Sequence, residues 1–307
     1  GGVFMFNAKV IKNEKYGRCL QISKGGNEML VTLDFGPRII SFKRAEGENI
    51  LGEDLPLKMF VEGEDWKLVG GHRFWHGPES FPRTYIPDND PVEFEVSENK
   101  VIIRQKEEKM TSLRKTIEIS PMDEHNFKIV HKLRNNGLFD VKVALWAITV
   151  MRMGGVAIMP LDDKDTGFLP NRQFSIWPYT DIKDKRFELS NRFVAIRQQE
   201  MEGKLKIGID SGKRCACYIE GEDIFIKRFD KFEDREYIDG GCNLEVYTDK
   251  KAIELETLSP IYNIKVGHEA YHEEVWEILK YEDKSLLDER ITDKDFEKII
   301  DRYMDFR

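Results

Sequence analysis

Apolar and polar residues alternate with a period of two in short stretches along most of the chain, and clusters of Gly, Pro, Asn and Asp separate these stretches. This period turns one face of a strand to the core and the other to solvent, so the pattern predicts half-buried antiparallel strands. The predicted strands cover residues 29–34, 100–105, 113–119, 127–133, 141–151, 192–198, 215–220, 224–229, 244–248, 252–257 and 272–279. We therefore expect an all-β fold, a large antiparallel β-sandwich.

A helical period is found only near the C-terminus. Phe296, Ile299, Ile300 and Tyr303 fall on one helix face, and Thr292 precedes them as an N-cap. We expect this helix to pack on the edge of the sandwich. Since neither a linker nor an internal repeat divides the chain, the sequence predicts one domain over 1–307, with 285–307 as a C-terminal helical extension.

Composition narrows the class of protein. The net charge is -8 without a basic block, which argues against nucleic acid as a partner. The longest apolar run, 143–151, is much shorter than the roughly 20 residues of a membrane span. The chain shows no leader pattern, so we expect a cytoplasmic protein without a membrane partner. Charged residues of both signs make up 34% of the chain, as is typical of a thermophile.

Two segments, 70–91 and 169–181, are predicted loops that mix aromatic residues with charged groups and prolines. Binding residues concentrate in such loops. His72 and His76 are four residues apart, but the flanking glycines and Pro78 disfavour a helix, so we expect no metal site. The other candidates for binding in these loops are Arg73, Trp75, Glu79, Arg83, Tyr85, Asp88, Asp90 and Trp177.

Carboxylates gather on two late strands. Glu254 and Glu256 share one face of their strand, and Asn243, Glu245 and Tyr247 share one face of the preceding strand. If the two faces coincide, three acids meet, and like charges raise the pKa of at least one of them toward the range of a general acid or base. The alternative is an exposed acidic face paired with Lys and Arg across strands.

These features resemble the galactose-mutarotase-like superfamily over about residues 20–280, and most closely a prokaryotic branch of it. The landmarks are Leu33-Asp-Phe-Gly-Pro-Arg-Ile39, Gly70-Gly-His-Arg-Phe-Trp-His-Gly-Pro-Glu79, Thr84-Tyr-Ile-Pro-Asp-Asn-Asp90, Ile176-Trp-Pro-Tyr-Thr-Asp181, Gly241-Cys-Asn-Leu-Glu245, and Glu254-Leu-Glu-Thr-Leu-Ser-Pro260 with Gly267.

The resemblance implies a sugar-binding site and an aldose 1-epimerase-like isomerase with Glu256 as general base. The family's acid is a His in a strand context like Ala-Leu-His, where this chain has Ala144-Leu-Trp146. An indole N–H donates a hydrogen bond but does not supply a proton to a ring oxygen. Either a loop histidine, His72 or His76, is the acid, or the protein binds sugar without interconverting anomers.

We expect a sugar or sugar derivative as the ligand, no cofactor, and allow for a homodimer. Arg38 joins the candidates for sugar binding, together with Trp146 as a flat apolar surface. No phosphate-binding glycine loop and no GxSxG elbow is present. Three functions remain open: an epimerase with Glu256 and His72 as catalytic residues, a non-catalytic carbohydrate-binding protein, and a glycoside-cleaving enzyme.

Overall fold

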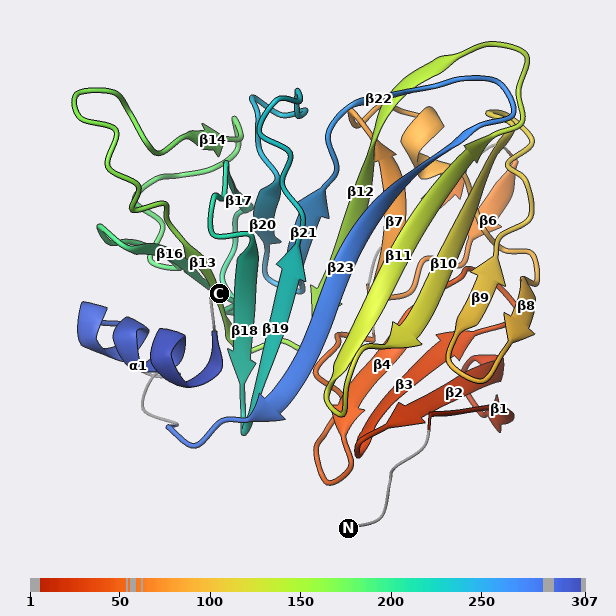
Figure 1. The fold of residues 1–307 in the computed structure, drawn as a ribbon, viewed down its shortest axis with the longest axis horizontal. Helices are drawn as coiled ribbons and strands as arrows, with labels where there is room; N and C mark the ends of the chain where they lie inside the picture. Colours follow the sequence, from red (N-terminus) through yellow and green to blue (C-terminus); the bar gives the residue numbers. More distant parts are fainter. Residues whose placement is uncertain (1–5, 54, 56–58, 62, 284–289, 305–307) are drawn as a thin grey trace.

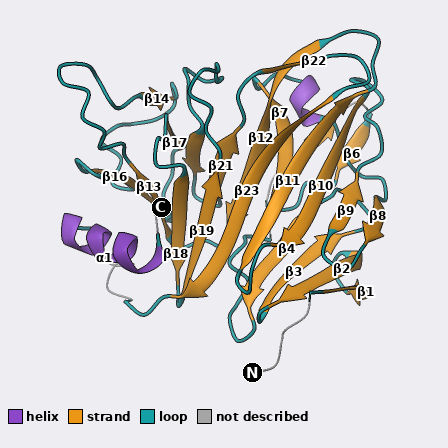
Figure 2. Ribbon diagram, in the orientation of Figure 1, coloured by secondary structure: helices purple, strands orange, loops and turns teal. Residues whose placement is uncertain are grey.

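Two large antiparallel sheets pack face to face in the computed structural model (Figures 1 and 2). Residues 6–53, 55, 59–61, 63–283 and 290–304 are described. The predicted all-β sandwich is thereby confirmed. No helix in these ranges is long and apolar enough to cross a membrane.

The strands of both sheets run antiparallel to their neighbours. In spatial order the first, 11-stranded sheet contains β1 (Asn7–Asn13), β2 (Gly17–Lys24), β3 (Asn27–Thr32), β4 (Ile39–Arg44), β7 (His72–Gly77), β12 (Val141–Met151), β21 (Ile253–Leu258), β20 (Leu244–Thr248), β17 (Leu205–Ile209) and β14 (Phe174–Ile176), with β22 (Tyr262–Ile264) paired to β12. The second, 10-stranded sheet contains β15 (Phe187–Leu189), β16 (Phe193–Arg197), β13 (Val156–Pro160), β18 (Cys215–Glu220), β19 (Asp223–Phe229), β23 (Glu269–Lys280), β11 (Asn126–Asn135), β10 (Leu113–Pro121), β9 (Val101–Arg104) and β8 (Glu93–Val96).

The smaller elements are a hairpin of β5 (Met59–Val61) and β6 (Glu64–Trp66), the short 3₁₀ helix η1 (Arg83–Tyr85) and the helix α1 (Asp293–Tyr303). Each predicted strand is confirmed to within two or three residues at its ends. The prediction of a loop over 70–91 was wrong at its start, where His72–Gly77 form the buried strand β7. Both faces of β7 are covered, so its sequence lacks the alternation of a half-exposed strand.

Helix α1 lies against the outer face of the second sheet, as Figure 1 shows beside β16 and β18. Thr292 caps it, with its hydroxyl accepting from the backbone N–H of Asp295, so the predicted N-cap is confirmed. Phe296 packs on Phe193 with ring centroids 4.8 Å apart. The remainder of the predicted extension, 285–289 and 305–307, lies outside the described residues.

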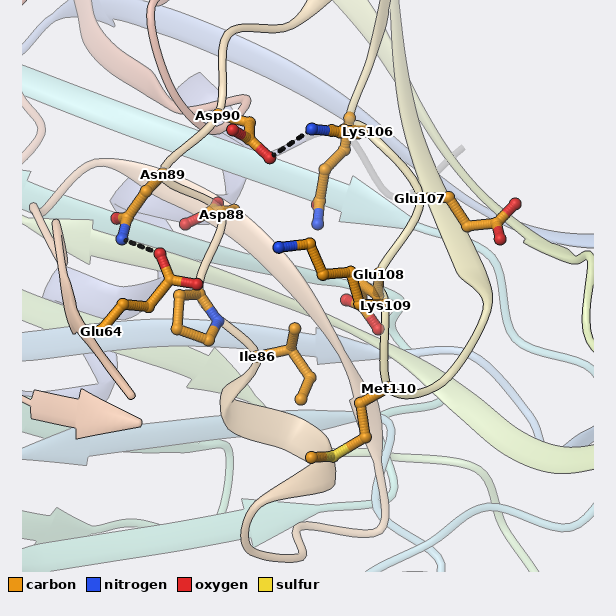
Figure 3. Close-up of a pocket in the computed structure, with 12 residues that line it drawn as sticks. Glu64, Ile86, Asp88, Asn89, Asp90, Lys106, Glu107, Glu108, Lys109 and Met110 are labelled. Atoms are coloured by element: carbon orange, nitrogen blue, oxygen red, sulfur yellow. Dashed lines mark hydrogen bonds and ion pairs between the residues drawn. The ribbon is translucent and has the colours of Figure 1, made fainter. Parts of the chain in front are cut away.

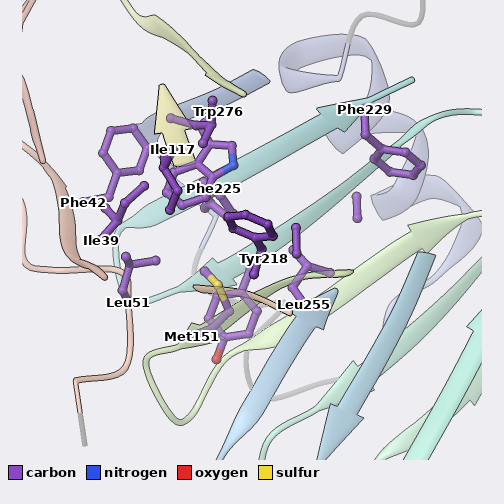
Figure 4. Close-up of a cluster of buried hydrophobic side chains, with 14 of the residues drawn as sticks. Ile39, Phe42, Leu51, Ile117, Met151, Tyr218, Phe225, Phe229, Leu255 and Trp276 are labelled. Atoms are coloured by element: carbon purple, nitrogen blue, oxygen red, sulfur yellow. The ribbon is translucent and has the colours of Figure 1, made fainter. Parts of the chain in front are cut away.

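Aromatic rings from both sheets meet in the main core (Figure 4). Trp276 of β23 is fully buried and packs edge-to-face on Phe225 of β19, with ring centroids 5.2 Å apart. Phe42 of the first sheet reaches Phe225 at 6.0 Å, which joins the two layers by aromatic contact.

A polar cluster also lies buried between the sheets, on the inner side of β7, β12 and β21. Its members come from six strands and are His72, His131, Thr149, Lys227, Thr257, His272 and Glu274, all at most 4% exposed. Lys227 Nζ donates to Thr149 Oγ1 at 2.6 Å and to the Leu255 carbonyl at 3.2 Å, and lies 3.0 Å from Glu274 Oε1. The ammonium group thus has an acceptor for each of its three protons.

The hydrogen-bond partners fix the protons of two histidines. His131 Nδ1 faces the carbonyl of His272 at 3.0 Å, and a carbonyl only accepts, so Nδ1 carries the proton. Neutral His131 then accepts at Nε2 from His72 Nε2, 2.7 Å away, and His72 Nδ1 accepts from the Thr149 hydroxyl at 2.9 Å. The cluster is satisfied with both rings neutral.

The cluster contains three possible metal ligands whose ligand atoms lie within 4.8 Å of one another: His72, His131 and Glu274. Among the described residues this is the one group of three that could hold a metal ion. Lys227 already places a positive charge beside Glu274, and the two imidazoles bond each other. A metal ion would have to displace the ammonium group, so the contacts favour an ion pair over a metal site.

The buried histidines predict that the protein loses stability in mild acid. Burial lowers the pKa of His72 and His131, and lowers that of His272 to about 3. Below about pH 6.5 the unfolded chain binds protons that the folded chain refuses, so the free energy of unfolding falls as pH drops, by about 1.4 kcal/mol per pH unit for each such proton. Guanidinium unfolding at several pH values between 7 and 5 measures this slope.

Comparison of variants isolates the contribution of one ring. His272→Gln keeps a donor for Thr257 but cannot titrate, so its slope between pH 7 and 5 should be smaller than that of the wild type. His125→Gln, at an exposed position, is the control and should keep the wild-type slope. Equal slopes for all three proteins would contradict the prediction.

Candidate functional site

A cavity of about 520 Å³ opens on the outer face of the first sheet, over β7, β12, β21, β20 and β17. It is enclosed by aromatic and charged side chains. The described residues that line it are Leu55, Leu68, Arg73, Trp75, Glu79, Tyr85, Trp146, Tyr179, Lys204, Lys206, Tyr247, Asp249, Lys251, Ala252, Glu254 and Glu256.

Strand register puts the acids on this face. Glu256 is directly opposite Glu245 of β20, and Glu254 is directly opposite Tyr247. On its other side Glu256 is opposite Ile148 of β12, which in turn is opposite Arg73 of β7. Residues directly opposite each other share a face, so the two acidic faces predicted from the sequence coincide.

Glu256 lies at the floor of the cavity and is fully buried. Its Oε2 accepts from the indole N–H of Trp146 at 2.6 Å and from Lys206 Nζ at 2.8 Å. Its Oε1 is buried without a hydrogen-bond partner among the described residues. A buried carboxylate oxygen left unpaired is costly, which makes it a ready acceptor for a ligand hydroxyl.

Lys206 links two carboxylates of the cluster. Its Nζ lies 2.7 Å from Glu245 Oε2 as well as 2.8 Å from Glu256 Oε2. Burial opposes its charge, but the two carboxylates prevail and raise the pKa of Lys206. Burial, together with the charges of Glu256 and Asp239, raises the pKa of Glu245 well above its ordinary value.

Arg73 and Glu254 form the neighbouring ion pair. Arg73 Nη2 lies 3.2 Å from Glu254 Oε1, and its guanidinium lies over the Trp75 ring, 4.4 Å from the centroid. Burial raises the pKa of Glu254 despite Arg73. Arg73 is 3% exposed, and its Nε and Nη1 have no partner in the described part of the chain. These N–H groups are donors available to a polar ligand.

Aromatic rings form one wall of the cavity. Trp75 packs edge-to-face on Trp146 at 5.5 Å and on Tyr85 at 5.0 Å. The Tyr85 hydroxyl donates to Glu79 at the entrance, where partial burial raises the pKa of Glu79. Indole and phenol rings beside paired polar groups are typical of small-molecule sites.

The two loop histidines lie elsewhere, which corrects the proposal that His72 or His76 faces Glu256. Both alternate with Arg73 and Trp75 along β7, so they point to the opposite side of the first sheet. His72 belongs to the interior polar cluster. His76 Nε2 lies 3.4 Å from Glu108, and its Nδ1 accepts from Arg83. Both histidines therefore make their contacts on the inner side of the sheet and not in the cavity.

Arg38 and Asp88 form a buried ion pair outside the cavity. Asp88 also accepts a hydrogen bond from the indole N–H of Trp66 at 2.7 Å. Asp88 and Asp90 line a second cavity of about 350 Å³ (Figure 3). There Asp90 pairs with Lys106 at 3.1 Å, and Asn89 donates to Glu64 at 2.9 Å. The polar groups of that second cavity largely satisfy one another.

Two further candidates have other partners. Asn243 accepts from the backbone of Ser211 at 2.7 Å and holds the turn next to β20. The Trp177 ring lies beside Lys206, with the ammonium nitrogen 4.6 Å from the centroid, so it borders the carboxylate cluster.

Lys206 is the main site residue that sequence reasoning missed. It lies in β17, a strand that the predicted set omitted, although Leu205, Ile207 and Ile209 alternate with Lys206 and Gly208. That alternation was the available signal. Tyr179 and Tyr247 also line the cavity, and burial raises the pKa of both hydroxyls.

No family model matches the chain, and no curated protein matches it in sequence. Solved structures do match. A candidate aldose 1-epimerase from Klebsiella pneumoniae superposes with a TM-score of 0.58 at 13% identity, over 92% of this chain and 84% of that one. A candidate mutarotase from Salmonella typhimurium gives 0.54 at 11%, over 90% and 94%. A candidate aldose 1-epimerase from Escherichia coli K12 gives 0.53 at 9%, over 89% and 100%. The chain therefore has the fold of the galactose-mutarotase-like proteins.

Proposed function

We propose that the protein binds a sugar in the cavity over β7, β12 and β21, and that Glu256 acts there as the base of an aldose 1-epimerase-type reaction. One observation carries the proposal: Glu256 Oε1 is a buried acceptor without a described partner, at the floor of a cavity of about 520 Å³ walled by indole rings. Arg73 adds unpaired donors beside it. The similarity in fold to candidate epimerases supports the same substrate class.

In the proposed reaction Glu256 Oε1 takes the proton of the anomeric hydroxyl, which opens the ring. Trp146 and Lys206 hold the other oxygen, so the carboxylate keeps one orientation. The aromatic wall excludes water from one side and offers apolar surface to a sugar ring. The cavity volume fits a sugar of one or two rings, since small-ligand sites commonly span about 300–1,000 Å³.

A second candidate is a carbohydrate-binding protein without turnover. The observation in its favour is Trp146, which stands where the resemblance expects a histidine acid and bonds Glu256 through its N–H. No histidine is found among the described residues that line the cavity. Binding needs only the free acceptor, the free donors and the rings. The third function, glycoside cleavage, has no such supporting observation.

Glu256→Gln separates the two candidates. The amide keeps the size and one acceptor of the carboxylate but is not a base, so we expect anomer exchange to fall by about 10²–10⁴-fold while sugar binding persists. Exchange NMR on a panel of aldoses and calorimetric binding measure the two effects. Glu118→Gln, at a strand carboxylate between Lys100 and Lys132, is the matched control. If the wild type exchanges anomers no faster than buffer but binds sugar, the result favours the binding protein. If the wild type neither exchanges anomers nor binds sugar, the result contradicts the proposed site.

Trp146→Phe tests the indole N–H. The change removes a hydrogen bond to a buried carboxylate, which is worth about 1.5–3 kcal/mol, so we expect the free energy of unfolding to fall by that amount. Anomer exchange should decrease but remain measurable, because Trp146 orients Glu256 and transfers no proton. Guanidinium unfolding and exchange NMR check the two parts. Complete loss of exchange in a variant of unchanged stability would show that Trp146 does more than orient the base.

A further inference from the structure

Ring opening needs a proton for the ring oxygen as well as a base, and one cation of the cavity is in direct contact with Glu256. Both loop histidines point to the other side of the first sheet. The cations among the described lining residues are Arg73, Lys204, Lys206 and Lys251. Lys204 and Lys251 are exposed at the entrance, and a guanidinium does not give up its proton.

Lys206 differs from the other cations in its contacts. Its Nζ donates to Glu256 Oε2 at 2.8 Å and also lies 2.7 Å from Glu245 Oε2, in an ion pair. No further acceptor for its N–H groups is found in the described part of the chain. Its ammonium nitrogen lies 4.7 Å from the ring centroid of Trp146 and 4.6 Å from that of Trp177. The aromatic faces favour the charge without taking the proton.

We propose that Lys206 is the general acid of this site, donating its proton to the ring oxygen of an aldose while Glu256 takes the proton of the anomeric hydroxyl. The inference rests on the proposed function. Glu256 and Lys206 are in contact, and the two sugar oxygens are bonded to the same carbon. One residue pair therefore reaches both oxygens from one side of the sugar.

The O–H electron pair of the anomeric hydroxyl forms the second bond of the new carbonyl, and its proton goes to Glu256 Oε1. The bond between the anomeric carbon and the ring oxygen breaks, its electron pair stays on the ring oxygen, and that oxygen takes a proton from Lys206 Nζ. The aldehyde rotates about its bond to the next carbon. The ring then closes by the reverse transfers, which restores both residues.

The charges favour this exchange of protons. In the resting site two carboxylates raise the pKa of Lys206 against the effect of burial, so the proton is held firmly. When Glu256 becomes neutral, one of these carboxylate charges disappears and Lys206 becomes a stronger acid. The leaving ring oxygen develops alkoxide character and is more basic than an amine, so the transfer is favourable. Base and acid are thus activated together.

Lys206→Arg distinguishes a proton donor from a structural counterion. Arginine keeps the positive charge and can bond both carboxylates, but it holds its proton at every accessible pH. We expect Lys206→Arg to bind sugar within a few-fold of the wild type and to lose about 10²–10⁴-fold in the rate of anomer exchange. Lys128→Arg, in a cross-strand ion pair with Glu273 at 2.6 Å outside the cavity, is the control.

Chemical rescue supplies a readout that a structural role would not give. In Lys206→Ala the space left by the side chain admits a small primary amine, so added methylamine or ethylamine should restore exchange in proportion to its concentration and according to its acidity. Circular dichroism and calorimetric sugar binding establish that each variant is folded; if Lys206→Ala is not, Lys206→Met takes its place in the rate comparison with Lys206→Arg.

The outcomes separate this inference from the proposed function. Exchange by the wild type, its loss in Lys206→Arg and its rescue by amines support Lys206 as the acid. Exchange in Lys206→Arg within threefold of the wild type, or a Lys206→Ala rate that amines leave unchanged, overturns the inference and leaves Glu256 as base. A wild type without exchange on any aldose overturns both.

Discussion

The pairing register of β7, β12, β21 and β20 is the constraint on which both the interior and the cavity depend. Along each strand alternate residues point to opposite faces, so a slip of one residue would exchange the two sets. In the observed register Arg73, Ile148, Glu256 and Glu245 form one row on the cavity face. Their sequence neighbours His72, Thr149 and Thr257 point inward to the interior polar cluster.

The interior polar cluster reinforces that register from behind. Lys227 contacts Thr149 of β12 and the Leu255 carbonyl of β21, while Glu274 accepts from Thr257 and from the indole of Trp276. Buried polar groups are costly unless every one is paired, so this arrangement tolerates few alternatives. The cluster holds strands of both sheets in fixed positions, and the cavity residues on the reverse side are fixed with them.

The polar groups of the cavity, unlike those of the interior polar cluster, are not all paired. There the polar atoms are paired incompletely: Glu256 Oε1 and two nitrogens of Arg73 are buried without described partners. A fold that pairs the groups of the interior polar cluster and leaves these atoms unpaired on the other side of the sheet has the arrangement of a binding site. The carboxylates, Lys206 and the indole rings together suit a ligand that carries both hydroxyl groups and apolar ring faces.

The sequence by itself determined the sandwich, most strand positions, the capped C-terminal helix and the pairing of Glu254 with Glu256 on one face, because these follow from local alternation and capping. It could not decide which face of β7 carries the site. His72 and His76 resembled loop donors, yet both point inward. The sequence did not reveal this orientation, because β7 is covered on both sides and its residues show no alternation. Lys206 reaches Glu256 only through the pairing of β17 with β20 and of β20 with β21. Contacts between residues 50 positions apart are set by tertiary packing, which no local pattern encodes.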